Sequence, residues 1–166
     1  MRYQGLLYRA LNPIYAKEPL SGRGAELYGG RFNAKGTAAL YLSIEVLTAV
    51  REANQVGTLQ PTTMVAYEAD IEDLFDCRDP SSLFTHGWSP DDLAAPTWRD
   101  EMKTSGRSRT QAFSADLEAA GFAGLVVRSF AKGSSDTDLN VVLWHWTDDL
   151  PHKLKVIDDE GRLTKS

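Results

Sequence analysis

Apolar and polar positions alternate in two stretches of the chain, and such alternation is typical of β-strands. In residues 5–11 (GLLYRAL), Leu7, Arg9 and Leu11 share one face of the predicted strand. In residues 62–71 (TTMVAYEADI), the same period predicts a half-buried antiparallel strand. Because an unpaired buried cation is costly, we expect Arg9 either to pair with a carboxylate or to serve the function of the protein.

A short strand and an amphipathic helix follow each other in the first third of the chain. TAALYLS (37–43) predicts the strand and IEVLTAVREANQ (44–55) the helix, with Ser43 as N-terminal cap and Gly57 as the stop. Helical spacing places Glu52 on the flank of the apolar face, where it can line a cleft. That apolar face is predicted to comprise Val46, Ala49, Val50 and Ala53.

The second half of the chain predicts one more helix and three strands. TQAFSADLEAAGF (110–122) is helical, and AGLVVRSFA (123–131) and LNVVLWHWT (139–147) are apolar strands. A short strand and a turn are expected within residues 152–163. The residues of the helix that are expected to be buried are Ala112, Leu117, Ala119 and Ala120.

Two long segments lack a regular pattern. Residues 13–36 are dense in Gly, Pro, Ser and Asn, which predicts a shaped loop, and residues 74–108 read as irregular and polar. Trp88 and Trp98 are expected to attach the second segment to the body of the protein. Strands outnumber helices, and no regular crossover helices separate them, so we predict an α+β fold with a mostly antiparallel sheet in one domain, residues 1–166.

Composition removes several functional classes. Apolar residues make up 42% and charged residues 25% of the chain, as in ordinary globular proteins, and the net charge of −5 argues against direct nucleic-acid binding. One cysteine and three histidines without ligand spacing predict no metal site. The apolar runs are too short for a signal sequence or a membrane span, so we expect a cytoplasmic protein that does not bind membranes.

Candidate chemistry centres on three residues from three neighbouring elements. Arg31 follows Gly29 and Gly30 in the loop, Tyr41 lies in the second predicted strand, and Glu52 lies in the first helix. No GxSxG elbow supports a serine hydrolase, and a metal-free ribonuclease normally requires a basic groove. Chemistry on NAD+ fits the residue types better, since pyrophosphate favours Arg, the bases favour an aromatic face, and an oxocarbenium-like ribose favours a carboxylate.

Several stretches, taken together and in order, resemble the RES-domain family, the toxins of toxin–antitoxin pairs often encoded with an Xre-like antitoxin. They are SGRGAELYGGRFN, ALYLS, VREA, TQAFSADLEAAGFAGLVVRS and LNVVLW, and they extend over nearly the whole chain. The resemblance implies a fold like that of ADP-ribosyltransferases, a split antiparallel sheet with a cleft for NAD+, and a reaction that consumes NAD+.

The resemblance also assigns functional residues. Arg31, Tyr41, Glu52 and Ser129 match the catalytic motif, with Ser43, Ser134 and Ser135 as alternative serines. Residues implied to bind NAD+ are Arg9, Gly30, Arg31, Tyr41, Ser43 and Asn140. Glu52 is expected to stabilise the positive charge that develops when the glycosidic bond breaks, and Ser129 to orient Glu52 or the nicotinamide amide.

The acceptor of ADP-ribose stays open at this point. Transfer to a protein would make the chain a mono-ADP-ribosyltransferase, and transfer to water or phosphate would make it an NAD+ glycohydrolase or phosphorylase that depletes NAD+. A ribonuclease or a non-catalytic nucleotide-binding module is a more distant alternative, although the latter gives no task to Glu52. The resemblance further implies a tightly bound antitoxin.

Overall fold

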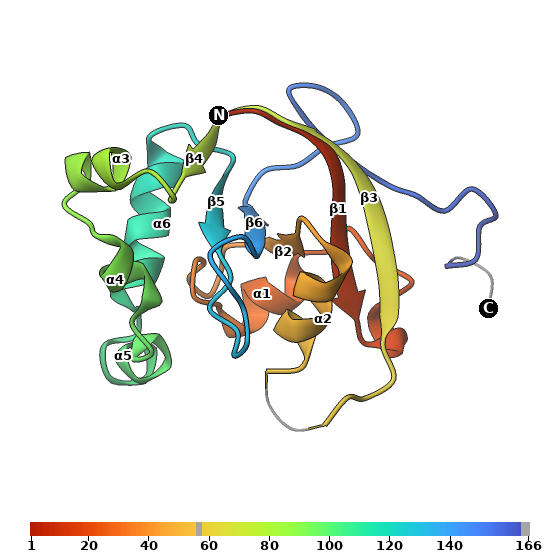
Figure 1. Ribbon diagram of the computed structural model, residues 1–166, viewed down its shortest axis with the longest axis horizontal. Helices are drawn as coiled ribbons and strands as arrows, with labels where there is room; N and C mark the ends of the chain where they lie inside the picture. The colour runs from red at the N-terminus through yellow and green to blue at the C-terminus, as the bar shows by residue number, and fades with distance from the viewer. Residues whose placement is uncertain (56–57, 164–166) are drawn as a thin grey trace.

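A computed structural model describes residues 1–55 and 58–163 of the chain, which build one curled seven-stranded sheet (Figure 1). The strand order is β4-β5-β6-β2-β1-β3-β7, and every neighbouring pair is antiparallel except β4 and β5. The predicted α+β class with a mostly antiparallel sheet is therefore confirmed. The strands are β1 (Tyr3–Leu11), β2 (Leu40–Ser43), β3 (Thr63–Ile71), β4 (Leu74–Asp76), β5 (Gly124–Arg128), β6 (Leu139–Leu143) and β7 (His152–Val156).

Short helices interrupt both segments that were predicted to be irregular, and strand β4 begins the second, so the prediction was wrong for these stretches. Pro and a capping Asp79 or Ser89 begin two of the helices, and these residues are equally common in turns. The predicted stop Gly57 lies outside the described residues. Among those described, no helix is both long and apolar enough to cross a membrane. The helices are a 3-10 turn (Pro13–Tyr15), α1 (Arg23–Tyr28), α2 (Val46–Ala53), α3 (Pro80–Thr85), α4 (Pro90–Ala94), α5 (Trp98–Ser105) and α6 (Arg109–Ala119).

Two clusters of buried apolar residues form the core of the protein. The face of β3 that alternation predicted is confirmed, because its apolar members are buried with Leu7 and Leu11 of β1. A second cluster joins β4 and β5 to helices α3 and α6, which lie side by side on the left of Figure 1. The buried face of α6 differs from the prediction, because Ala119 and Ala120 are exposed. It consists of Thr110, Gln111, Phe113, Ser114 and Leu117.

The buried face of helix α2 agrees only in part with the one that apolar spacing predicted, because Ala49 is buried as predicted but Val46 and Ala53 are exposed. Val46 is 41% exposed, whereas Thr48 and Ala49 are buried. The Thr48 hydroxyl donates a hydrogen bond to Asp138 at 2.8 Å, so a polar contact decides how the helix is turned. The large majority of buried side-chain hydroxyls have a hydrogen-bond partner, and Asp138 supplies it for Thr48.

The centre of the sheet brings three strands with candidate residues into register. Ser43 of β2 lies opposite Tyr8 of β1 on one side and opposite Asn140 of β6 on the other. Tyr41, two positions earlier in β2, points to the same face as Ser43 and lies opposite Val142. This register gathers candidate side chains on one face of the sheet, beside α2.

Candidate functional site

A cavity of about 360 Å³ lies on this face of the sheet. Its volume falls in the range of small-molecule sites in proteins. Of the residues first assigned to the catalytic motif or to NAD+ binding, all but Ser129 line it directly; Ser129 is buried with 0% exposure, and the alternative serines Ser134 and Ser135 do not line it. The predicted residues that line the cavity are Arg9, Gly30, Arg31, Tyr41, Ser43, Glu52 and Asn140.

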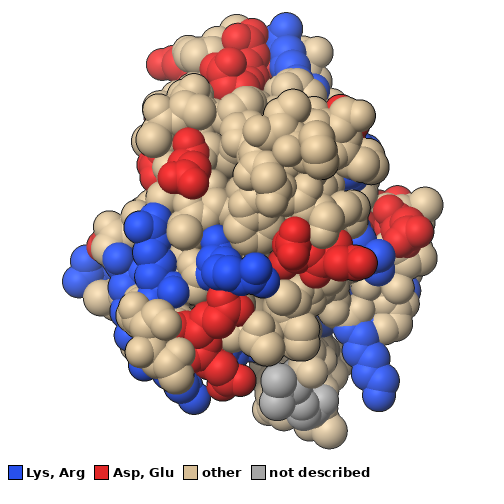
Figure 2. Space-filling model, turned by 90° about the vertical axis from the view of Figure 1, so that its left-hand side faces the viewer, with Lys and Arg blue, Asp and Glu red and all other residues tan. Residues whose placement is uncertain are grey.

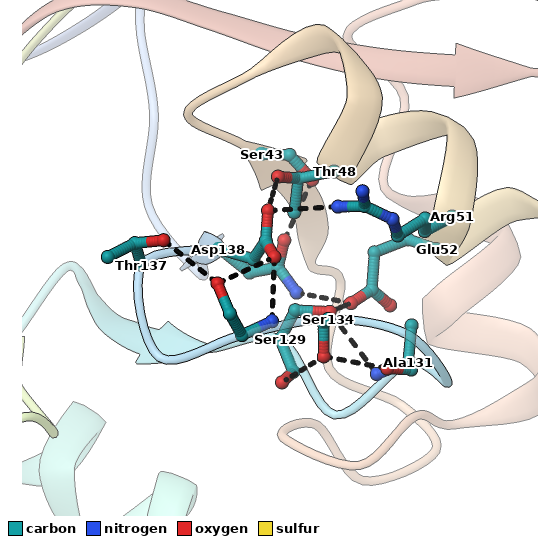
Figure 3. A network of polar contacts seen from close by, with 11 residues as sticks. Ser43, Thr48, Arg51, Glu52, Ser129, Ala131, Ser134, Thr137 and Asp138 are labelled. Atoms are coloured by element: carbon teal, nitrogen blue, oxygen red, sulfur yellow. Dashed lines mark hydrogen bonds and ion pairs between the residues drawn. The ribbon is translucent and has the colours of Figure 1, made fainter.

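The Glu52 carboxylate is held from several sides. Its Oε1 accepts hydrogen bonds from the Ser129 hydroxyl and from the Asn140 side-chain amide, the latter at 2.7 Å. Its Oε2 accepts from the Gln55 amide at 2.7 Å. Figure 3 shows Glu52 and Ser129 pointing toward each other from α2 and from the loop after β5. The carboxylate is thus fixed in direction while it faces the cavity.

The candidate serines have different environments. Ser43 donates to the Asn140 side-chain oxygen at 2.7 Å, so it supports Glu52 one step removed. Ser134 donates to the Ser129 carbonyl at 3.0 Å and does not reach Glu52. Ser135 hydrogen-bonds Asp138 through its backbone N–H at 2.7 Å. Of the four candidate serines, Ser129 is the one in direct contact with Glu52.

Asp138 fastens helix α2 to the loop that carries Ser129 (Figure 3). One of its oxygens accepts from Thr48 at 2.8 Å and from Arg51 at 3.1 Å. Its backbone carbonyl accepts from the Ser129 N–H at 2.7 Å. The hydrogen bond from the Ser135 backbone, followed by the one from Thr48, lowers the pKa of the Asp138 carboxyl. Asp138 therefore links the helix that carries Glu52 to the loop that carries Ser129.

Arg31 lines the same cavity as Glu52. Its Nη1 donates to the carbonyls of Leu93 at 3.0 Å and Ala95 at 2.8 Å, and its guanidinium lies 4.8 Å from the Phe130 ring centre. Burial, and next the neighbouring Arg99, lower the pKa of Arg31, and Glu52 opposes this shift. Among the described residues no carboxylate forms an ion pair with Arg31, so its charge is open to an anionic ligand.

Tyr41 holds the loop on which Arg31 sits. Its hydroxyl donates to the Asn33 side-chain oxygen at 2.6 Å and accepts from the Phe32 N–H at 3.1 Å. Burial raises the pKa of Tyr41, so the phenol keeps its proton. A Cβ atom on Gly30 would collide with this hydroxyl, which explains the glycine directly before Arg31. The Tyr41 hydroxyl is therefore engaged within the protein, and the ring is the part left to contact a ligand.

Arg9 has no carboxylate partner among the residues that the structure describes. Its Nη1 donates a long hydrogen bond of 3.5 Å to the Pro19 carbonyl. The stronger hydrogen bond to that carbonyl comes from the Tyr67 hydroxyl, at 2.6 Å. The sequence analysis offered two roles for Arg9, pairing with a carboxylate or serving the function of the protein. Pairing with a carboxylate is not observed among the described residues.

The cavity residues that the sequence analysis did not assign to the site include two arginines and two aromatic residues: Arg99, Arg128, Trp98 and Phe130. Trp98 and Arg99 begin helix α5, in the segment predicted to be irregular, so nothing placed them near Arg31. Trp98 was expected only to pack, and it is 8% exposed. On the face where α3 to α6 lie, Lys and Arg side chains form separate groups interrupted by Asp and Glu (Figure 2). On this face, positive charge is therefore divided into separate groups.

Comparison with known proteins identifies the family. The model of the RES domain matches residues 6–166. This chain belongs to the RES domain family. A segment of 47 residues is 47% identical to the protein named Toxin Res from Yersinia enterocolitica, and it covers 28% of this chain and 31% of that relative. The resemblance that the sequence motifs indicated is therefore confirmed.

Proposed function

We propose that this RES-domain protein is the toxin of a toxin–antitoxin pair and that it cleaves NAD+ at the bond between nicotinamide and ribose. The observation that carries the proposal is the Glu52 carboxylate, fixed by Ser129 and Asn140 at the wall of a cavity that also holds unpaired arginine charge. The family membership and the name of the Yersinia relative support the assignment as a toxin.

The proposed reaction needs little proton transfer. The bond between C1′ of the ribose and the ring nitrogen of nicotinamide breaks, and its electron pair leaves with the nitrogen, so a cationic ring departs as neutral nicotinamide. The ribose is left with oxocarbenium character, which Glu52 stabilises electrostatically more strongly than it stabilises the ground state. An acceptor oxygen then forms the new bond to C1′ and releases its proton to the solvent.

Ser129 and Asn140 serve this step by holding the carboxylate in one direction before the charge develops. A preorganised group costs no reorganisation at the moment of reaction. We propose a protein side chain as the acceptor, which makes the chain a mono-ADP-ribosyltransferase. The alternative acceptors are water and phosphate, and an antitoxin would silence the activity in the host cell.

Incubation of the purified protein with NAD+ and a cell lysate tests the proposal. Free nicotinamide, ADP-ribose on proteins, free ADP-ribose and its phosphorylated form are followed by mass spectrometry. We expect nicotinamide release by the wild type and its loss in Glu52→Gln. Glu45→Gln is the matched control, because Glu45 directly precedes α2 and is exposed outside the cavity. Equal release by Glu52→Gln and the wild type would contradict the proposal, and the labelled product identifies the acceptor.

A further inference from the structure

Arginines and aromatic rings alternate along one wall of the cavity. The Arg99 guanidinium lies 4.4 Å from the centre of the Trp98 ring, and Arg31 lies 5.9 Å from the same ring. Arg31 is also 4.8 Å from the Phe130 ring, and Arg128 lies 5.8 Å from that ring. All five residues line the cavity, and we call them the arginine–aromatic stack. Each spacing is within the reach of a cation–π contact.

Positive charge in this stack is poorly compensated. Arg31 and Arg99 form no ion pair with a carboxylate among the described residues, and their mutual repulsion contributes to the lowered pKa of Arg31. Arg128 pairs with Asp136 at 3.0 Å, but the Asp136 side chain is 88% exposed. An ion pair at such an exposed site is weak, so a ligand can displace it. The stack thus presents three guanidinium groups to a partner with more than one negative charge.

Arg31 and Trp98 give the stack a fixed centre, and the exposed Arg99 and Arg128 lie at its two ends. Arg31 is tied to the carbonyls of Leu93 and Ala95, and Trp98 is buried beneath Arg99. Stacking on a ring fixes the plane of a guanidinium and leaves its N–H groups at the edge free to donate. Planar arginines held in this way favour phosphate oxygens, which they bind through paired hydrogen bonds.

We propose that the arginine–aromatic stack is the subsite for the pyrophosphate of the dinucleotide, with Arg99 and Arg128 as the residues that contact phosphate. Arg31 at the centre keeps the two rings and their arginines assembled. This inference rests on the proposed function, in which the nicotinamide ribose lies beside Glu52. The pyrophosphate then lies at the arginine–aromatic stack, away from Glu52. Asp136 then competes with phosphate for Arg128.

Binding of ADP-ribose, measured by titration calorimetry, tests the subsite without any turnover. We expect Arg99→Gln and Arg128→Gln each to raise Kd about tenfold, which corresponds to about 1.4 kcal/mol. Asp136→Asn should have the opposite effect and lower Kd, because it frees Arg128. Arg23→Gln and Glu26→Gln are the matched controls, because these residues form an exposed ion pair of their own at 3.6 Å and do not line the cavity. Circular dichroism confirms that each variant is folded.

Three results would overturn the subsite: no binding of ADP-ribose by the wild type, equal Kd values for Arg99→Gln and the wild type, or equal shifts in Arg99→Gln and Arg23→Gln. The last would mean that net charge alone matters. These failures are separate from a failure of the proposed function, which nicotinamide release by the wild type reports. Release that depends on Glu52, with a KM for NAD+ that is unchanged in Arg99→Gln, would remove the subsite and keep the reaction.

Discussion

Replacement of Tyr41 by phenylalanine separates a role in holding the loop from a role in contacting the substrate. The change removes one hydroxyl and keeps the ring. It leaves the Asn33 side-chain oxygen and the Phe32 N–H without the partners they have at 2.6 and 3.1 Å. Asn33 is 1% exposed, so its oxygen cannot turn to water.

The expected loss follows from these two groups. A buried polar group without a partner costs about 1–3 kcal/mol. The Phe32 N–H lies beside the cavity and can regain a water, so only the Asn33 oxygen stays unpaired, and we expect Tyr41→Phe to lower the free energy of unfolding by about 1–3 kcal/mol. Urea denaturation measures it, with Tyr15→Phe as control, because Tyr15 is 67% exposed. Unfolding free energies that match the control would refute the holding role. Such a match together with a lower kcat/KM would point to substrate contact instead.

Three further predictions concern neighbouring features of the site. Ser129→Ala should lower kcat for nicotinamide release more than Ser43→Ala, because only Ser129 contacts Glu52 directly; the opposite order would show that Ser43 is the critical serine. Gly30→Ala should raise KM for NAD+, since the added methyl displaces either the loop or the hydroxyl that holds it. The pKa of Asp138 is lowered in the folded state, so its contribution to stability is present above the unfolded value of about 3.9 and is lost as pH falls below it. Asp138→Asn should flatten the loss of stability on acidification that urea denaturation records.

The sequence predicted the strands better than the segments between them. Alternation over residues 62–71 identified β3 with nearly correct bounds, because every second side chain of a strand with one buried face points into the core and is mostly apolar. Helices α3 to α5 are five to eight residues long, too short to repeat a helical period clearly. The start signals of α3 and α4, a proline after Asp79 or after Ser89, were therefore read as turns.

The candidate site, too, was predictable from the sequence only in part. Register alone brings Ser43 and Asn140 together, and motif resemblance identified Glu52 and Ser129 although 77 positions separate them. Nothing local in the sequence records that Asp138 joins α2 to the Ser129 loop, since its partners lie about ninety residues earlier. Contacts of this kind depend on tertiary packing, which residue patterns within one element do not carry.

The two walls of the cavity are built in different ways, and Arg31 links them. Glu52 is fixed to the sheet through Asn140 and Ser129, whereas Trp98 and Arg99 belong to helix α5, outside the sheet. Arg31 extends from the loop that Tyr41 holds and binds the carbonyls just before α5. Its charge therefore organises the cavity even before any ligand arrives. A substitution of Arg31 would therefore change the arrangement of the cavity as well as the binding of a ligand. Substitutions of Arg99 and Arg128, the outer arginines of the stack, test binding alone.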